Sequence, residues 1–183
     1  INEIEINEEL QKYKNYNIQN IINNSNTIYR AYSNCIYWLK NSLYDSDNRN
    51  LGYYNDIQTK LTNYLKGEVI NWLIDIINKE TITEKLLEYL NINDYKDINM
   101  YIYNLLSTEK TINNNITTLF ILNQLIQVPI IIYNNSFDII YIFDKDIIDI
   151  KEAKKYQNNK NYINILYEYY NIYKYPINIK ALY

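Results

Sequence analysis

The spacing of apolar residues changes once along this chain, near residue 128. Before that point, apolar side chains recur in several segments every three or four residues, which is the spacing of one face of an α-helix. After it, the segments VPIIIY and FDIIYIF are nearly continuous and rich in isoleucine, as is typical of strands buried in a sheet. Helices therefore come first, and a small sheet is built mainly from the C-terminal third. This order predicts an α+β fold with a three-layer α/β/α arrangement.

No internal repeat and no linker divides the 183 residues, so we expect a single domain over 1–183, with 1–23 as an N-terminal helical extension. A loop is expected over 44–56, and Gly67 is expected to bend the helix that contains it. The expected helices cover 28–43, 57–77, 81–90, 97–107 and 116–127, and the expected strands cover 128–133, 137–143 and two segments of 162–179 that are separated by a turn near Asn171.

The composition is strongly biased. Ile, Asn and Tyr make up roughly half of the residues, whereas Gly and Pro occur twice each, which indicates codon pressure from an AT-rich genome. The net charge of −3 comes without a run of basic residues and argues against nucleic acid as a partner. One cysteine excludes an internal disulfide and a cysteine-based zinc site, and Asp144, Asp146 and Asp149 lack the glycine turn and distal glutamate of a calcium loop. We expect no metal and no cofactor.

No apolar run approaches the ~20 residues that span a bilayer, so no membrane association is expected. The opening segment INEIEINEEL is acidic and lacks the pattern of a signal peptide. A cytoplasmic, reducing compartment is therefore expected, in a host cytoplasm or a virion. The chain begins with Ile1 rather than Met, as a fragment or a processed product would.

A loop of small polar residues, NNSN, leads into a helix that begins TIYRAYSN. This stretch resembles the signature of the OTU family of cysteine proteases (deubiquitinases), which reads Asp-Gly-Asn-Cys-Leu-Phe/Tyr-Arg-Ala. On that signature, Asn24, Ser25 and Asn26 occupy the positions of the loop that forms the oxyanion site. Thr27 occupies the position of the catalytic cysteine, and residues 28–31 follow the remaining pattern closely.

Two later blocks extend the resemblance to nearly the whole chain. NNNITTLFILNQLIQVPIIIYNN is similar to the family's Trp-Gly-Gly motif, helix and central strand. YINILYEYYNIYKYPINI is similar to the closing pair of strands, the second of which carries the catalytic histidine. There Lys174 stands at the histidine, Tyr175 at the following tyrosine and Pro176 at the acidic residue of the triad.

The resemblance implies thiolate chemistry that this chain cannot perform. Thr27 offers a hydroxyl in place of a thiol, and the chain contains no histidine to activate it. Lys174 would serve as a base only if it were strongly desolvated, and Pro176 has no side-chain acceptor to orient one. Ser25 in place of glycine restricts the backbone of the oxyanion loop.

The sequence therefore indicates a catalytically inactive OTU-like domain that binds or scaffolds another protein. Ubiquitin or a ubiquitin-like protein is the first expected partner, and a viral or parasite assembly is the expected setting. Two alternatives stay open. The domain is a weakly active isopeptidase that uses Thr27 with Lys174, or it is a structural subunit with another α/β fold.

Four other residues have both a structural and a functional interpretation. Cys35 lies about two turns after Thr27 on the apolar stripe, so we expect a small buried hydrophobic residue rather than a second nucleophile. Arg30 is expected to pair with a local acid or with loop carbonyls. Trp38 and Trp72 are expected in the core rather than at an interface.

Overall fold

The computed structural model describes residues 16–21, 26–41, 51–78, 115–169 and 178–183, and it combines helices with a small mixed sheet. The expected α+β class is therefore confirmed, whereas the helices expected over 81–90 and 97–107 lie outside the described residues. The elements in chain order are β1 (Ile18–Asn20), α2 (Thr27–Asn41), α3 (Leu51–Asn78), α6 (Asn115–Leu125), β2 (Ile130–Tyr133), β3 (Ile139–Phe143), the 3-10 helix η3 (Ile150–Lys155), β4 (Ile163–Glu168) and β5 (Asn178–Leu182).

The five strands form one sheet in the order β1-β5-β4-β2-β3. Strand β2 pairs in parallel with β4, and the other neighbouring strands pair antiparallel. The prediction of a central strand followed by a hairpin partner is confirmed, because β2 lies between β4 and β3. Pro129 directly precedes β2, where a strand tolerates the loss of one amide donor.

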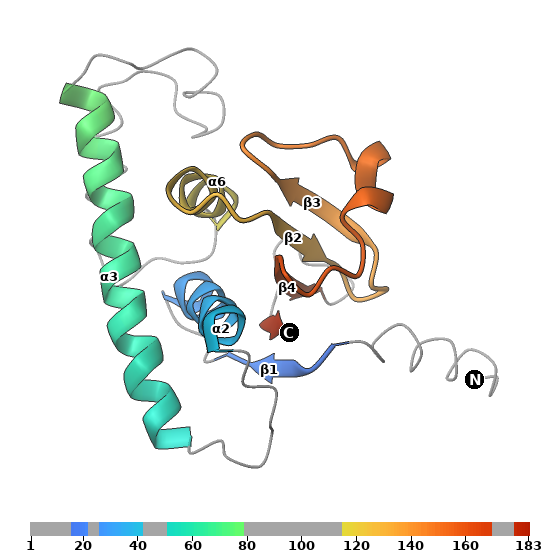
Figure 1. Ribbon diagram of the computed structural model, residues 1–183, viewed down its shortest axis with the longest axis horizontal. Helices are drawn as coiled ribbons and strands as arrows, with labels where there is room; N and C mark the ends of the chain where they lie inside the picture. The colour runs from blue at the N-terminus through green and yellow to red at the C-terminus, as the bar shows by residue number, and fades with distance from the viewer. Residues whose placement is uncertain (1–15, 22–25, 42–50, 79–114, 170–177) are drawn as a thin grey trace.

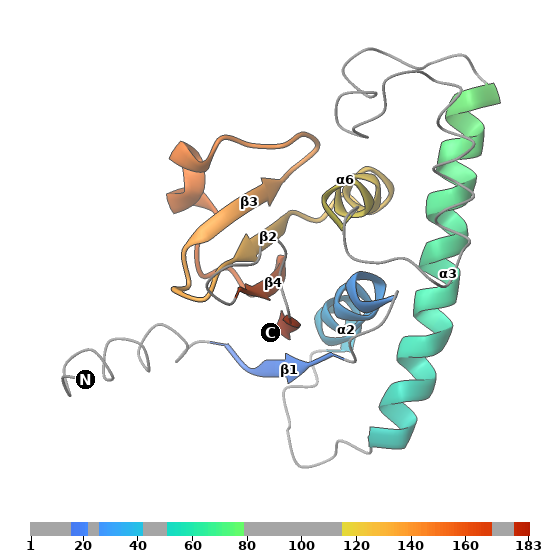
Figure 2. The ribbon, with the colours of Figure 1, turned by 180° about the vertical axis from the view of Figure 1, so that it is seen from behind.

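Two layers of helices lie on one face of the sheet (Figures 1 and 2). Helices α2 and α6 lie between the sheet and α3. Within the described part of the chain, η3 is the only helix on the opposite face, where Ala153 and Tyr156 pack against the sheet. Of the described helices, η3 alone represents the second helical layer of the expected three-layer arrangement.

The continuous run of isoleucines in β2 is explained by burial on both faces. Ile130 and Ile132 belong to the core between the sheet and the helices, whereas Ile131 and Tyr133 belong to the core beneath η3. All four side chains are fully buried. A strand covered on both sides has no solvent face, so it does not show the polar alternation of an exposed strand.

The hairpin turn between β2 and β3 includes a residue with a left-handed backbone. Phe137 has a φ of 61°, which is uncommon for a residue other than glycine. Its ring stacks on Tyr133, with ring centroids 4.5 Å apart, and Asn134 Oδ1 accepts the amides of Ser136 and Asp138 at 3.0 Å each. Stacking and the Asn134 side chain together hold the turn in this conformation.

The expected N-terminal helical extension is wrong for residues 18–20, which form strand β1. This strand adds to the edge of β5, where Ile18 lies opposite Leu182. The Asn17 amide donates to the Tyr183 carbonyl at 2.7 Å, and the Tyr183 amide donates to the Asn17 carbonyl at 3.1 Å. The extended backbone of β1 is thus stabilised by hydrogen bonds with residues at the other end of the chain. The remainder of the expected extension lies outside the described residues.

Helix α3 is longer and more regular than expected. It begins at Leu51, so the last part of the loop expected over 44–56 is helical. It also continues through Gly67, where a bend was expected. Leu65, Val69 and Leu73 are buried against the inner helices, and this packing outweighs the low helix propensity of one glycine.

Two buried asparagines on helices differ in how their amides are satisfied. Asn123 on α6 donates to the Val128 carbonyl at 3.0 Å and accepts the Lys145 amide at 2.8 Å. Asn34 on α2 is 0% exposed, and neither its Oδ1 nor its Nδ2 has a hydrogen-bond partner within the described residues. Asn123 therefore stabilises the link between α6 and the turn that follows β3, whereas the buried amide of Asn34 is destabilising.

We predict that Gly67→Ala raises the free energy of unfolding by about 0.5–1 kcal/mol. A Cβ at this position meets no heavy atom within 4 Å, so alanine removes backbone freedom of the unfolded chain without a clash. The midpoint of urea unfolding measures the change. An unchanged or lower midpoint would show that the helix is not continuous at Gly67.

Alanine should have opposite effects at the two asparagines. We predict that Asn34→Ala raises the free energy of unfolding by about 1–2 kcal/mol, because it removes two unpaired polar atoms and improves helix propensity. Asn123→Ala should lower it by about 1–3 kcal/mol, because it leaves the Lys145 amide without its acceptor. Urea titrations of both variants test the pair, and a loss of stability in Asn34→Ala would contradict the packing described for α2.

Candidate functional site

Helix α2 begins at Thr27, in the position that the sequence predicted for a degenerate active-site helix. The carbonyl of Asn26 accepts the amide of Arg30 at 2.9 Å, which closes the first turn. Thr27 is only 4% exposed, and the first turn carries no acidic residue. The partial positive charge of the helix amino end is therefore not offset by a carboxylate within that turn.

A lysine from α3 reaches this helix start. Lys66 Nζ donates to Asn26 Oδ1 at 3.2 Å, and partial burial lowers the pKa of the Lys66 ammonium group. No ion pair joins Lys66 to a carboxylate of the described residues. The sequence analysis missed Lys66, because it lies 40 residues from Asn26 along the chain and no local motif marks it.

The first turns of α2 are tied to α3 by hydroxyl groups. Ser33 Oγ donates to the Tyr29 carbonyl at 2.7 Å and lies 3.5 Å from Thr62 Oγ1 on α3. Ser33 and Thr62 are fully or almost fully buried. The contact between Ser33 and Thr62 joins α2 to α3 one helical turn before Lys66 on α3.

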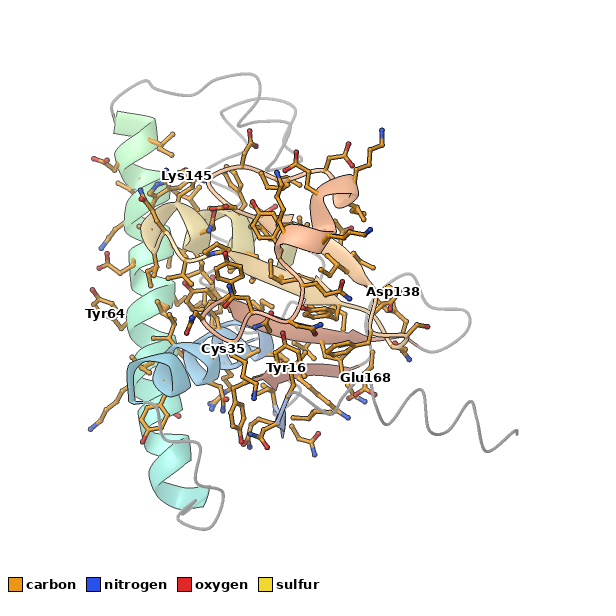
Figure 3. The ribbon with its side chains drawn as sticks, turned by 45° about the vertical axis from the view of Figure 1, so that its right-hand side comes forward. Tyr16, Cys35, Tyr64, Asp138, Lys145 and Glu168 are labelled. Carbon is orange, nitrogen blue, oxygen red and sulfur yellow. The ribbon has the colours of Figure 1, made fainter. Side chains whose placement is uncertain are left out.

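Cys35 lies where α2 meets the sheet (Figure 3). Its Sγ is 3.4 Å from the carbonyl oxygen of Asn164 on β4 and 3.9 Å from that of Leu182 on β5. Burial raises the pKa of the Cys35 thiol to about 12, so the group stays protonated at neutral pH. The interpretation of Cys35 as a small buried residue is confirmed, because a reactive cysteine would be exposed and have a lowered pKa.

The orientation of α2 relative to the sheet follows from two contacts. Cys35 lies beside Leu182, and Tyr37, two residues further along the helix, packs against Tyr183, one residue further along the strand direction. Helix α2 therefore runs in the same direction as β5. Its amino end points toward the side of the sheet on which β5 begins, at Asn178.

Not all of the predicted site residues can be placed. Thr27 and Asn26 are described, whereas Asn24, Ser25, Lys174 and Pro176 lie outside the described residues. The structure therefore brings together Asn26, Thr27 and Lys66, the last of which the sequence analysis did not anticipate. The expected pairing of Thr27 with Lys174 stays a prediction.

The expectations for Arg30 and Trp72 can be compared with the structure. The buried Nε of Arg30 has no hydrogen-bond partner within the described residues, so the expected pairing through this atom is not seen there. Trp72 packs against the core at its border, as expected. The side chain of Trp38 is outside the described part of the structure.

The carboxylates of the expected solvated segment are used in local hydrogen bonds. Asp144 accepts the Tyr156 hydroxyl at 2.9 Å, Asp146 accepts the Ile147 amide at 2.9 Å, and Asp149 accepts the Lys151 amide at 3.0 Å at the start of η3. Across the described residues, no group of three or more His, Cys, Asp or Glu side chains is arranged to hold a metal ion. Likewise, none of the described helices combines the length and the apolar character needed to cross a bilayer.

We predict that the Cys35 thiol of the folded protein does not react with a disulfide reagent such as DTNB at pH 8, and that one thiol per chain reacts after unfolding in urea. Because the pKa of Cys35 is raised from 9.0 to about 12 in the folded protein, folding favours the protonated thiol. The stabilisation that results is fully present below pH 9.0 and is lost as the pH rises through about 12. Cys35→Ser provides the blank. Rapid labelling of the folded protein would contradict the described burial.

Comparison with known proteins finds a viral relative of this chain. The chain is 36% identical over 175 residues to an uncharacterized protein of Acanthamoeba polyphaga mimivirus. The match covers 91% of this chain but only 11% of the viral protein, so the chain corresponds to a small part of a much longer polypeptide. No protein-family model matches the chain, and no solved structure matches it.

Proposed function

We propose that this chain is a degenerate OTU-like domain of viral origin, catalytically inactive, that binds a protein partner. The observation that carries the proposal is the helix start at Thr27. A buried hydroxyl occupies the position that the resemblance assigns to a catalytic cysteine, in a chain without histidine. The viral relative supports the viral origin.

The order of elements supports the OTU-like assignment. Helix α6 leads through Pro129 into β2, which is a central strand, as in the second block of the resemblance. Strands β4 and β5 are adjacent and antiparallel, as in its closing pair.

The orientation of α2 also supports the proposal. Its amino end points toward the side of the sheet at which β5 begins, and the positions of Lys174 and Pro176 immediately precede β5 in the sequence.

The chemistry of the described residues supports inactivity. A threonine hydroxyl needs a base, and Thr27 is almost completely buried. Lys66 reaches the start of α2, but its ammonium group donates a hydrogen bond to Asn26. Loss of any one member of a hydrolytic triad lowers the rate by several orders of magnitude, and here the thiol and the imidazole are both absent.

The proposed partner is a protein, with ubiquitin or a ubiquitin-like protein as the first candidate. The net charge of −3 and the absence of a basic cluster in the sequence give no support to nucleic acid. The proposed compartment is the cytoplasm of an infected host cell or the virion, in line with the viral relative.

Incubation with linkage-defined di-ubiquitin chains and with a ubiquitin vinyl sulfone probe tests inactivity. We predict no cleavage and no covalent adduct for the wild type, because neither a thiolate nor an imidazole is present. An active OTU protease is the positive control. Cleavage or labelling that disappears in Thr27→Ala would overturn the proposal in favour of a weak isopeptidase that uses Thr27.

Binding is tested separately by titrating isotope-labelled ubiquitin with the wild-type chain and following the ubiquitin amide resonances. We predict saturable shifts. Lys66→Ala should weaken binding about tenfold, or about 1.4 kcal/mol, because we propose the start of α2, which Lys66 reaches, as part of the contact surface. Lys151→Ala, which removes an exposed lysine of η3, is the matched control. The absence of shifts would exclude ubiquitin as the partner.

A further inference from the structure

The two edges of the sheet differ in how they are protected. Strand β3 forms one edge, where the Ile148 amide donates to the Ile142 carbonyl at 2.9 Å and Ile147 bridges to Phe143. The chain that follows β3 therefore covers part of this edge. Strand β1 forms the other edge, and no described residue pairs with its outer side. Uncovered edges are the sites at which strands of other chains add to a sheet.

The hydrogen-bonding direction of β1 is set by its contact with β5. Asn17 exchanges two hydrogen bonds with Tyr183, so its amide and carbonyl both point toward β5. Successive residues of a strand point alternately to opposite sides. The amide and carbonyl groups of Ile18 and Asn20 therefore point away from the sheet, where no described residue accepts or donates to them.

The side chains of this edge lack the usual protection against pairing. Ile18 is 41% exposed, although it lies on the sheet face that also buries Leu182. The edge residues Asn17, Gln19 and Asn20 are uncharged, and β1 contains no proline, lysine or bulge. Natural edge strands are commonly protected by such features. An uncharged edge can meet a second copy of itself without repulsion between like charges.

We propose that β1 is a dimerisation edge, at which two copies of this chain pair antiparallel about a two-fold axis through Ile18. The outward groups of Ile18 permit this register, in which Ile18 pairs with Ile18 of the second copy. The two exposed isoleucines then lie side by side on one face. Antiparallel pairing of identical edges is two-fold symmetric, so the assembly closes as a dimer with one continuous sheet.

The contact is short, so the dimer is weak and depends on concentration. Sedimentation velocity of the full chain from about 5 to about 500 μM tests it, and we expect the weight-average mass to rise toward that of a dimer over this range. Ile18→Lys places two ammonium groups opposite each other in the proposed register and should keep the chain monomeric. Ile18→Val should retain the dimer.

Ile150→Lys is the matched control, because Ile150 is another exposed isoleucine, 53% exposed, that lies on η3 away from β1. It should dimerise as the wild type does. Circular dichroism of each variant checks folding. A wild type that stays monomeric at all concentrations, or a dimer that Ile18→Lys leaves intact while folded, would overturn the proposal.

Hydrogen exchange of the wild type gives a test that needs no variant. The Ile18 and Asn20 amides should exchange rapidly at low protein concentration and slowly at high concentration, because no described residue of the same chain accepts them and pairing with a second copy would protect them. The Asn17 amide, which donates to Tyr183 within the chain, should be protected at both concentrations. Equal exchange of the Ile18 amide at both concentrations would also overturn the proposal.

Discussion

The close approach of α2 to the sheet is the contact on which the rest of the structure depends. Ala31 and Cys35 are small enough to let the helix lie directly on β4 and β5, with Sγ 3.4 Å from the Asn164 carbonyl oxygen. Helix α3 packs on α2 and α6 rather than on the strands, so its position depends on theirs. A bulky residue at position 35 would push α2 outward, and with it the Asn26 side chain that Lys66 contacts.

The sequence predicted well the elements whose secondary structure is indicated by a pattern within their own residues. Helix α2 has a regular apolar stripe, and β2 has a run of isoleucines after a proline, so each segment carries its own signal. Strand β1 carries none, because its hydrogen bonds come from Tyr183 at the other end of the chain. Of the candidate site, Thr27 at the helix start was predictable from the motif, whereas Lys66 depends on the packing of α3 against α2.

The compositional bias leaves polar atoms in the core. Tyr32 and Tyr167 are almost completely buried, and neither hydroxyl has a hydrogen-bond partner within the described residues. Burial raises the pKa of both groups, so they remain neutral and the penalty is that of an unpaired hydroxyl, about 1–3 kcal/mol each. Phenylalanine would pack in the same space without this penalty. The excess of tyrosine is therefore consistent with codon bias rather than with function at each position.

The start of α2 keeps an electrostatic environment that would favour an anion. The amino end of the helix carries partial positive charge, and the Lys66 ammonium group donates a hydrogen bond to Asn26 beside it. These are conditions under which a cysteine thiol would ionise more readily, but the Thr27 hydroxyl stays protonated at neutral pH and gains nothing from them. Inactivity under the proposed function thus comes from the loss of the nucleophile and the base, not from loss of the surrounding charge. Under the proposed function, this charge would favour hydrogen-bond acceptors of a bound protein, such as backbone carbonyls or carboxylates.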